Sequence, residues 1–295
     1  MFPVLSGFCM KKCPDCQATY PFDEAVCPCC GFHPATRGGF QAYAQELSRG
    51  EHAFAFENYQ TLAAVEADSF WFQARNRLIV WALRTYYVRM KSFLEIGCGT
   101  GFVLSCIRQT FPDLCLYGSE IATDGLAFAA KRLPGVPLMQ MDARHIPFSQ
   151  EFDGIGAFDV LEHVREDEEV MRQVHSALKP NGLFILTVPQ HMWLWSATDN
   201  AAKHVRRYTK PELHGKLARA GFRVLCSTSF VSLLLPAMMF SRRTTQKQDA
   251  TCELRLPTWM NTACSYCMRL EEFFIRCGIS LPLGGSRLVI SRRIA

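Results

Sequence analysis

The segment that most constrains the fold is a short apolar run that ends in three closely spaced glycines. Phe93 to Ile96 has the pattern of a buried strand, and Gly97, Gly99 and Gly101 follow it before a helical stretch begins. Glycines between a strand and a helix let a ligand approach the backbone and meet the positive end of the helix dipole. We therefore expect a binding loop at this strand-to-helix junction.

The order of elements after this loop predicts a parallel sheet. Short apolar runs alternate with helical stretches, and the runs that read as strands are 93–96, 114–118, 137–141, 153–158, 183–188, 222–228 and 286–292. Thr209 followed by Glu212 resembles a capping box, which predicts a helix that Gly221 ends. Such alternation favours an α/β fold, a Rossmann-like, doubly wound, mostly parallel sheet with helices on both faces.

Two residues, Phe102 and Glu95, restrict the class of ligand that the loop can bind. A phosphate-binding loop requires Lys and Ser or Thr after its last glycine, and a dinucleotide fingerprint requires glycine at the position of Phe102. Glu95 places a carboxylate at the end of the strand, where it would repel a pyrophosphate and attract a cation. The loop alone would also be compatible with a tight turn that binds no ligand.

Five ordered blocks resemble the motifs of the class I S-adenosylmethionine-dependent methyltransferases. They are Leu94-Glu-Ile-Gly-Cys-Gly-Thr-Gly, the acid Glu120, Met141-Asp-Ala, Phe158-Asp-Val-Leu-Glu-His-Val and Leu178-Lys-Pro-Asn-Gly. The resemblance extends from about residue 54 to residue 223 and implies a seven-stranded sheet and S-adenosylmethionine as cofactor.

The resemblance also implies roles for single residues. Glu120 would accept hydrogen bonds from the ribose hydroxyls, and Asp142 would accept one from the adenine amino group. This family more often has Asp at the position of Glu120, which changes the reach of the side chain. The full set of cofactor-binding residues that we expect is Glu95, Gly97, Cys98, Gly99, Gly101, Glu120, Ile121, Asp142 and Ala143.

Candidates for a general base follow the fourth and fifth strands. Asp159 and His163 lie where ligands bind in open α/β sheets, and His204 lies in Lys203-His-Val-Arg-Arg-Tyr, which resembles a substrate-side segment in part of the family. Each of the two histidines also has a simpler, structural interpretation. His163 would be half of a structural Glu-His pair that closes a turn, and His204 would be a surface histidine.

Cysteines are concentrated at the N-terminus. Of fourteen in the chain, six lie between residues 9 and 30, and Cys13, Cys16, Cys27 and Cys30 have the spacing C-x2-C-x10-C-x2-C of a zinc ribbon. Four thiolates would hold a closed, structural Zn²⁺. Cys29 is an alternative ligand to Cys30, and a cluster of reduced cysteines without metal is the simpler possibility.

Composition separates the chain into two domains. We expect a zinc-ribbon-like module over residues 1–36 and a methyltransferase domain over 37–295, with a helical insertion at about 230–285 before the last strand. The longest apolar stretch, 230–240, is too short to span a bilayer, so membrane contact would be peripheral.

The expected function is methyl transfer to a small-molecule acceptor, one that is hydrophobic or linked to a lipid. Two alternatives stay open: a binding or interaction protein without catalysis, and an RNA methyltransferase. The net charge of +5 comes without any basic run, which disfavours nucleic acid. Scattered cysteines and the absence of a signal-peptide pattern point to the cytoplasm. The sequence does not determine the oligomeric state.

Overall fold

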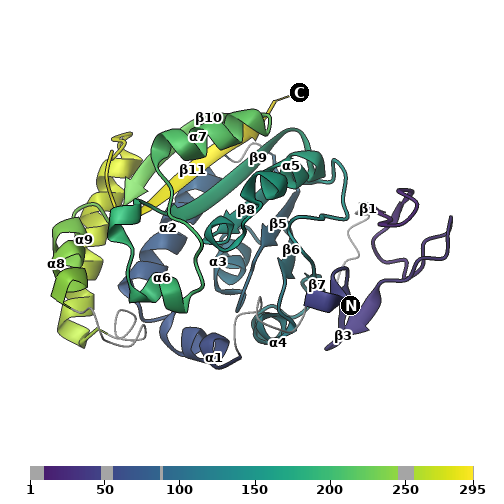
Figure 1. Ribbon diagram of the computed structural model, residues 1–295, viewed down its shortest axis with the longest axis horizontal. Coiled ribbons are helices and arrows are strands. Elements are labelled where there is room, and N and C mark those ends of the chain that lie inside the picture. The colour runs from purple at the N-terminus through teal and green to yellow at the C-terminus, as the bar shows by residue number, and fades with distance from the viewer. Residues whose placement is uncertain (1–9, 48–55, 87–88, 245–255, 295) are drawn as a thin grey trace.

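The protein is built around one large sheet with helices on both faces (Figure 1). The computed structural model describes residues 10–47, 56–86, 89–244 and 256–294. The sheet has the strand order β10-β11-β9-β8-β5-β6-β7-β4-β3. In the order of the sheet, these strands are Phe222–Phe230, Ser286–Arg293, Leu178–Pro189, Phe152–Phe158, Ser92–Ile96, Cys115–Glu120, Leu138–Gln140, Phe40–Ala42 and Ala35–Arg37.

The central strands are parallel, as the alternation of strands and helices predicts. β5 pairs in parallel with β6 and with β8, and β8 pairs in parallel with β9. Only β11, among the strands on this side of the sheet, runs antiparallel to its neighbours β9 and β10. The carboxyl ends of β5, β6 and β8 therefore meet at one edge of the sheet, and this edge is where open α/β folds bind ligands.

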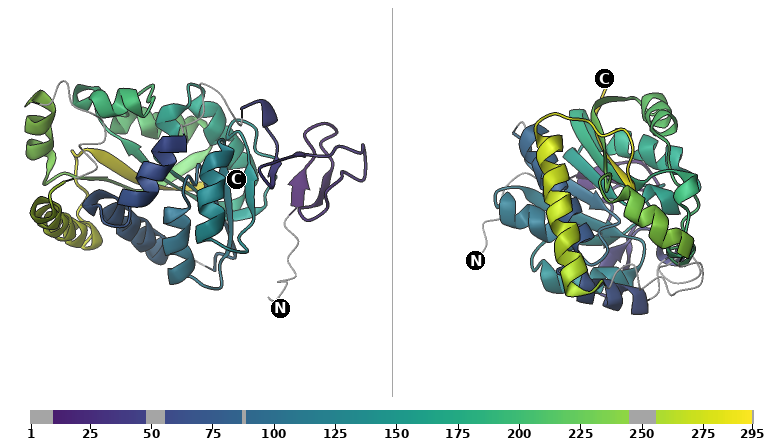
Figure 2. Two further views of the ribbon diagram at one scale, coloured as in Figure 1. Left: turned by 90° about the horizontal axis from the view of Figure 1, so that it is seen from below. Right: turned by 90° about the vertical axis from the view of Figure 1, so that its left-hand side faces the viewer.

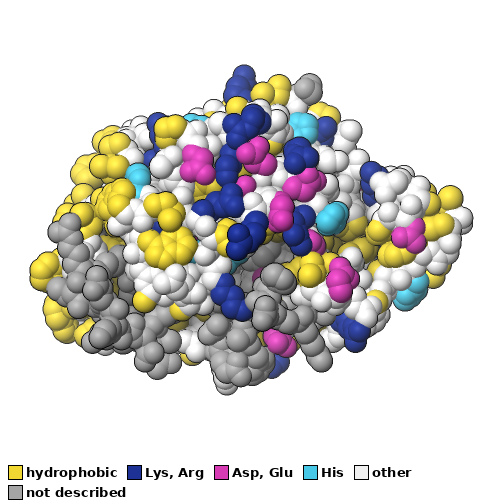
Figure 3. All heavy atoms as spheres, in the orientation of Figure 1, with side chains coloured by type: hydrophobic (Ala, Val, Ile, Leu, Met, Phe, Trp, Pro, Cys, Tyr) yellow, Lys and Arg dark blue, Asp and Glu magenta, His cyan; other side chains and the backbone are white. Residues whose placement is uncertain are grey.

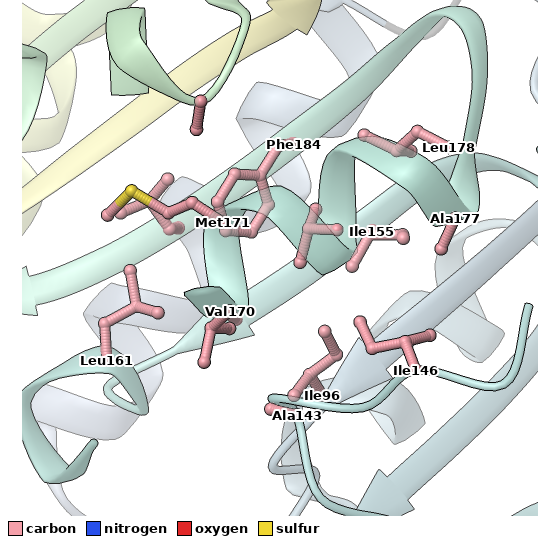
Figure 4. Close-up of a cluster of buried hydrophobic side chains, with 14 of the residues drawn as sticks. Ile96, Ala143, Ile146, Ile155, Leu161, Val170, Met171, Ala177, Leu178 and Phe184 are labelled. Atoms are coloured by element: carbon pink, nitrogen blue, oxygen red, sulfur yellow. The ribbon is translucent and has the colours of Figure 1, made fainter. Parts of the chain in front are cut away.

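Two groups of helices cover the two faces. On one face lie α5 (Asp167–Ala177) and α7 (Lys210–Arg219), and on the other lie α2 (Phe70–Tyr86), α3 (Phe102–Thr110) and α4 (Thr123–Arg132). Figure 4 shows Val170 and Met171 of α5 against Ile155 and Phe184 of the sheet, and all four side chains are buried. As predicted, the Thr209 side chain accepts a hydrogen bond from the Glu212 amide at the start of α7.

The predicted strands are present, and the sheet is wider than expected. All seven sequence runs correspond to strands β5 to β11. The expectation of seven strands was incomplete, because β3 and β4 form a hairpin whose second strand pairs in parallel with β7 at the sheet edge. Each has only three residues, too few to show an alternating pattern in the sequence. The predicted domain boundary after residue 36 falls inside this hairpin.

The N-terminal cysteine segment lies at one end of the molecule. It contains β1 (Met10–Lys12) and β2 (Thr19–Pro21), which pair only with each other. The Lys12 amide donates to the Pro147 carbonyl, and the Phe22 ring contacts Tyr117 and Phe148. These contacts attach the segment to the β6 side of the sheet.

The described part of the insertion before the last strand forms two helices at the opposite end of the molecule (Figure 2). They are α8 (Leu235–Thr244) and α9 (Thr258–Arg276). Arg77 of α2 makes a bidentate ion pair with Glu272 of α9, and the Asn261 side chain bonds the backbone of Asp68 and Phe70. Within the described ranges, no helix combines the length and apolar character that crossing a bilayer requires.

The turn from β5 into α3 requires glycine for packing as well as for backbone geometry. Gly97 has φ +66°, and a Cβ there would lie 2.5 Å from Cγ2 of Val160. A side chain in the left-handed region costs about 1–2 kcal/mol, and overpacking adds about 1–3 kcal/mol.

We predict that Gly97→Ala lowers the free energy of unfolding by about 2–5 kcal/mol, measured by urea denaturation. Gly135→Ala is the matched control. Gly135 has φ +81° with nothing within 4 Å of a Cβ, so this variant should lose only the backbone cost of about 1–2 kcal/mol. Equal losses in the two variants would show that contact with Val160 does not matter.

Candidate functional site

The glycine loop offers open space at its middle residue. Gly97 and Gly101 are packed against protein atoms, since a Cβ on Gly101 would lie 2.8 Å from Leu133. A Cβ on Gly99 would instead find its nearest neighbour, Tyr59, at 4.0 Å. The backbone of Gly99 is thus the part of the loop that a ligand can approach.

Glu120 lies at the end of β6 and faces the loop. Its carboxylate accepts hydrogen bonds from the amides of Gly99, at 3.0 Å, and Ile121, at 2.8 Å. Burial raises the pKa of Glu120, while these amides and the Tyr59 hydroxyl oppose the rise. Tyr59 belongs to α1 (Phe56–Val65), so this helix contacts the same carboxylate. A ribose placed here would compete for the oxygens that now bond the loop.

Glu95 is a buried acid with an incompletely satisfied carboxylate. Burial raises its pKa well above the usual range, although the positive charge of Arg75 and a hydrogen bond from the Leu104 amide act in the other direction. Among the described residues, Oε2 of Glu95 finds no hydrogen-bond partner. A buried, unpaired carboxylate oxygen costs free energy, and a cationic ligand would remove that cost.

Asp142 and its neighbours complete the predicted cofactor side. The Asp142 carboxylate bonds the amide and the guanidinium of Arg144. Burial favours a higher pKa for Asp142, but the bonds from Arg144 outweigh it and the pKa is lowered. Cys98 and Ala143 are buried beside the loop and the third motif. An adenine amino group would have to share the Asp142 carboxylate with Arg144.

Asp159 directly follows β8 and is paired with a counter-ion. Its carboxylate lies 2.6 Å from Nη1 of Arg75 and accepts a hydrogen bond from Thr187 at 3.1 Å. Its backbone φ of +59° is unusual for a residue other than glycine. Arg75 is itself buried, with its guanidinium over the rings of Trp71 and Phe72. The Arg75 interaction makes Asp159 a poor candidate for a free general base.

His163 and His204 come together although forty residues separate them. Their ring centroids are 4.7 Å apart. His163 keeps access to solvent at its surface, yet burial of its ring, with the nearby His204, lowers its pKa to about 4. The 3-10 turn Leu161–His163 follows β8 after two residues and places Glu162 close to these rings.

A buried network orients His204. Its Nδ1 lies 2.8 Å from the Asp199 carboxylate, which also accepts two hydrogen bonds from Arg207. Burial would raise the pKa of Asp199, but these bonds hold it well below its usual range. Asp199 closes a capping box with Ser196 at the start of α6 (Ala197–Ala201). Arg207 thus supports the position of His204 from inside the protein and is not a solvated surface cation.

The four cysteines of the predicted zinc site also meet. Sγ of Cys13 lies 3.5 Å from Sγ of Cys30, and Sγ of Cys16 lies 3.6 Å from Sγ of Cys27. All four sulfurs are within 4.8 Å of one another, whereas Cys29 is exposed and outside the cluster. Thiolates at about 2.3 Å from a tetrahedral Zn²⁺ have comparable separations. Cys9 lies outside the described residues.

Three features of the site escaped sequence reasoning. Tyr59 gave no signal because it lies on a separate helix, and the pairing of Arg75 with Asp159 joins residues 84 positions apart. Glu162 was visible as the acid of Asp-x-x-Glu-His, but the sequence does not reveal that both oxygens are buried. Only the fold shows that a structural Glu-His pair would leave this acid unsatisfied.

Comparison with known sequences places this site in a family context. Residues 57–227 match the family described as a methyltransferase domain. Probable S-adenosylmethionine-dependent methyltransferases of Mycobacterium tuberculosis are 25% identical over 170 residues, covering 55% of this chain and 59% of the relative. A fatty-acid O-methyltransferase of Mycolicibacterium smegmatis is 29% identical over 103 residues, covering 34% of this chain and 38% of that protein. The chain thus spans about three fifths of the length of the Mycobacterium tuberculosis relatives.

Solved structures support the fold. The crystal structure of a [4+2]-cyclase aligns with 76% of this chain and 83% of its own, with a TM-score of 0.52 and 19% identity. At this identity the likeness concerns architecture and carries no information about the reaction. The orphaned Glu95 oxygen and the open backbone at Gly99 are the observations of this chain that fit a cofactor carrying positive charge.

Proposed function

The chain belongs to the S-adenosylmethionine-dependent methyltransferases that carry the methyltransferase domain, and on this premise we propose that it transfers the methyl group of that cofactor to a small, apolar acceptor. The observation that carries the proposal is the unpaired, buried Oε2 of Glu95 beside the open backbone of Gly99. S-adenosylmethionine has an ammonium and a sulfonium, and a carboxylate in a buried site favours such charges.

Each cofactor residue has a role in this proposal. Glu120, at the end of β6, would exchange its bond to the Gly99 amide for the ribose hydroxyls. Asp142, two residues after β7, would accept a hydrogen bond from the adenine amino group while it keeps its bonds to Arg144. Loop residues Gly97, Cys98 and Gly101 fix the turn, and Ile121 and Ala143 line it. Methyl transfer from a sulfonium requires alignment of the methyl group with the acceptor and exclusion of water.

The proposed acceptor side lies between β8 and residues 190–208. His163 and His204 are the candidates for a general base there, and Asp199 holds His204. Asp159, the third catalytic residue expected from the sequence, is held by Arg75 and would act by fixing this edge. The amide of Val205 donates to the Glu162 carbonyl, so the two segments are joined by their backbones. An acceptor bound between them would meet the cofactor at the carboxyl edge of the sheet.

An apolar face on α9 supports an apolar acceptor or a peripheral membrane contact. Trp259, Tyr266, Leu270 and Phe273 are between 51% and 71% exposed, and their spacing places them on one side of the helix. Arg269 and Arg276 are exposed beside this row. Hydrophobic side chains gather at this end of the molecule in Figure 3. The relative that is named for fatty acids is compatible with an acceptor of this kind.

The N-terminal cysteines are proposed to hold a structural Zn²⁺ through Cys13, Cys16, Cys27 and Cys30. A closed set of four thiolates has no free coordination position, so the metal would stabilise residues 1–36 without taking part in catalysis. The domain from residue 37 onward would then hold both cofactor and acceptor.

An RNA acceptor is less favoured than a small molecule. Lys11 in the cysteine segment donates its ammonium to the carbonyls of Phe22 and Glu24 and is buried. On the face shown in Figure 3, Lys and Arg alternate with Asp and Glu, and Arg206 and Lys216 both pair with Asp167. Mixed charges of this kind do not form the basic stripe that a phosphate backbone requires.

Glu95→Gln should weaken cofactor binding by about 10- to 100-fold, because a hydrogen bond to a charged group is worth about 1.5–3 kcal/mol. Calorimetric titration of S-adenosylmethionine into the protein measures this. Glu168→Gln is the control, since Glu168 pairs with Arg219 on the surface of α5. Binding that is equally strong in both variants would remove Glu95 from the cofactor site.

His204→Ala should lower methyl transfer by about 10²-fold while the affinity for S-adenosylmethionine stays unchanged. Label transfer from methyl-labelled cofactor into cell-extract metabolites supplies the assay and identifies the acceptor class. His214→Asn is the comparison variant. His214 lies on α7, away from this edge, and its ring bonds the Ser227 hydroxyl of β10. Full activity of the His204 variant would exclude it from the reaction.

Metal analysis of protein purified without chelator should give close to one zinc per chain, and Cys27→Ser should remove it. Cys29→Ser is the matched control, because Cys29 is exposed and outside the cluster. Zinc near zero in the unaltered chain, or equal in the two variants, would contradict the structural zinc.

A further inference from the structure

A second cluster of ligand-type side chains lies at the carboxyl edge of the sheet. Glu162, His163 and His204 each offer one ligand atom, and these three atoms all lie within 4.8 Å of one another. We call these residues the Glu162 cluster. A metal at about 2.1 Å from each atom requires separations of about 4.2 Å or less, so small side-chain rotations would close the site.

The carboxylate of Glu162 is the least satisfied polar group of this edge. The residue is 0% exposed, and among the described residues neither of its oxygens receives a hydrogen bond from another side chain or backbone. The two nearby cations already have partners, since Arg75 pairs with Asp159 and Arg207 with Asp199. A buried carboxylate without a partner carries a large desolvation cost that a bound cation would offset.

Both histidines are oriented as metal-binding histidines usually are. One ring nitrogen of His163 bonds the Ala202 backbone, and Nδ1 of His204 bonds the Asp199 carboxylate. The remaining nitrogen of His204, Nε2, lies 4.0 Å from Oε1 of Glu162. Ligating imidazoles typically donate their second nitrogen to a carboxylate or a carbonyl, which fixes the ring and raises its basicity as a ligand.

We propose that Glu162, His163 and His204 bind a divalent first-row metal ion at the acceptor side of the site. Two imidazoles and a carboxylate suit Zn²⁺, Fe²⁺, Co²⁺ or Mn²⁺, and this donor set is distinct from the four thiolates at the N-terminus. Three protein ligands leave coordination positions open, which is the pattern of catalytic metal sites.

The open positions suggest the class of acceptor. His163 keeps access to solvent, so an acceptor oxygen can reach the metal from outside. A divalent ion lowers the pKa of a bound hydroxyl and orients it. An acceptor with a hydroxyl, or two adjacent oxygens, would gain most from such a site. This role rests on the proposed methyl transfer, whereas metal binding itself does not.

Co²⁺ titration of the full chain, loaded with zinc and without cofactor or acceptor, tests the site. Visible d–d bands should grow to saturation at one equivalent, without the intense near-ultraviolet bands of a thiolate ligand. Glu162→Gln and His204→Gln should weaken Co²⁺ binding at least tenfold, and Asp199→Asn should weaken it about 10- to 100-fold. His214→Asn should bind as the unaltered chain does.

Circular dichroism checks that each variant folds, and His163→Asn provides a ligand substitution at a residue on the surface. The proposal is overturned if the unaltered chain shows no saturable Co²⁺ bands, or if His163→Asn binds as tightly as His214→Asn. Calorimetry with S-adenosylmethionine separates the two proposals. A chain that binds Co²⁺ but not S-adenosylmethionine would contradict the proposed methyl transfer alone. A chain that binds S-adenosylmethionine but not Co²⁺ would contradict the metal site alone.

Discussion

Three buried carboxyl groups at one edge of the sheet are the constraint around which the rest of this molecule is arranged. Glu95 and Glu120 lie at the carboxyl ends of β5 and β6, Glu162 lies in the turn after β8, and burial raises the pKa of each. Parallel strands bring these side chains to the same edge, and each must find positive charge or hydrogen bonds there. Glu120 has backbone amides, whereas Glu95 and Glu162 keep oxygens unpaired among the described residues. The edge is thus prepared for ligands that carry positive charge.

How far the sequence predicts this edge depends on the range of the interactions. Gly97 and Thr209 act through their own backbone neighbourhoods, so the strand-to-helix turn and the start of α7 could be read locally. The pairs Arg75 with Asp159 and His204 with Asp199 depend on how distant segments fold against each other. No local pattern predicts which cation neutralises which acid. The shortness of β3 and β4 hid this hairpin, and the partner of β4 in the main sheet, β7, is almost a hundred residues away.

The N-terminal cysteine segment combines a cluster that the sequence predicts with an attachment that it does not. Its four sulfurs were predictable from spacing alone because two short turns place them together regardless of the rest of the fold. Its attachment was not, since the Phe22 ring reaches Tyr117 and Phe148 across the sheet edge. The β3–β4 hairpin that follows the segment joins the main sheet, whereas β1 and β2 pair only with each other.

Helix α2 gives the two ends of the site a common mechanical element. Arg75 on this helix holds Asp159 at the sheet edge, and Arg77, two residues later, holds Glu272 of α9. A rigid helix cannot shift at one of these residues and stay fixed at the other. The counter-ions of Asp159 and of Glu272 therefore lie within one turn of α2, and a displacement of that turn would disturb both the sheet edge and the seating of α9.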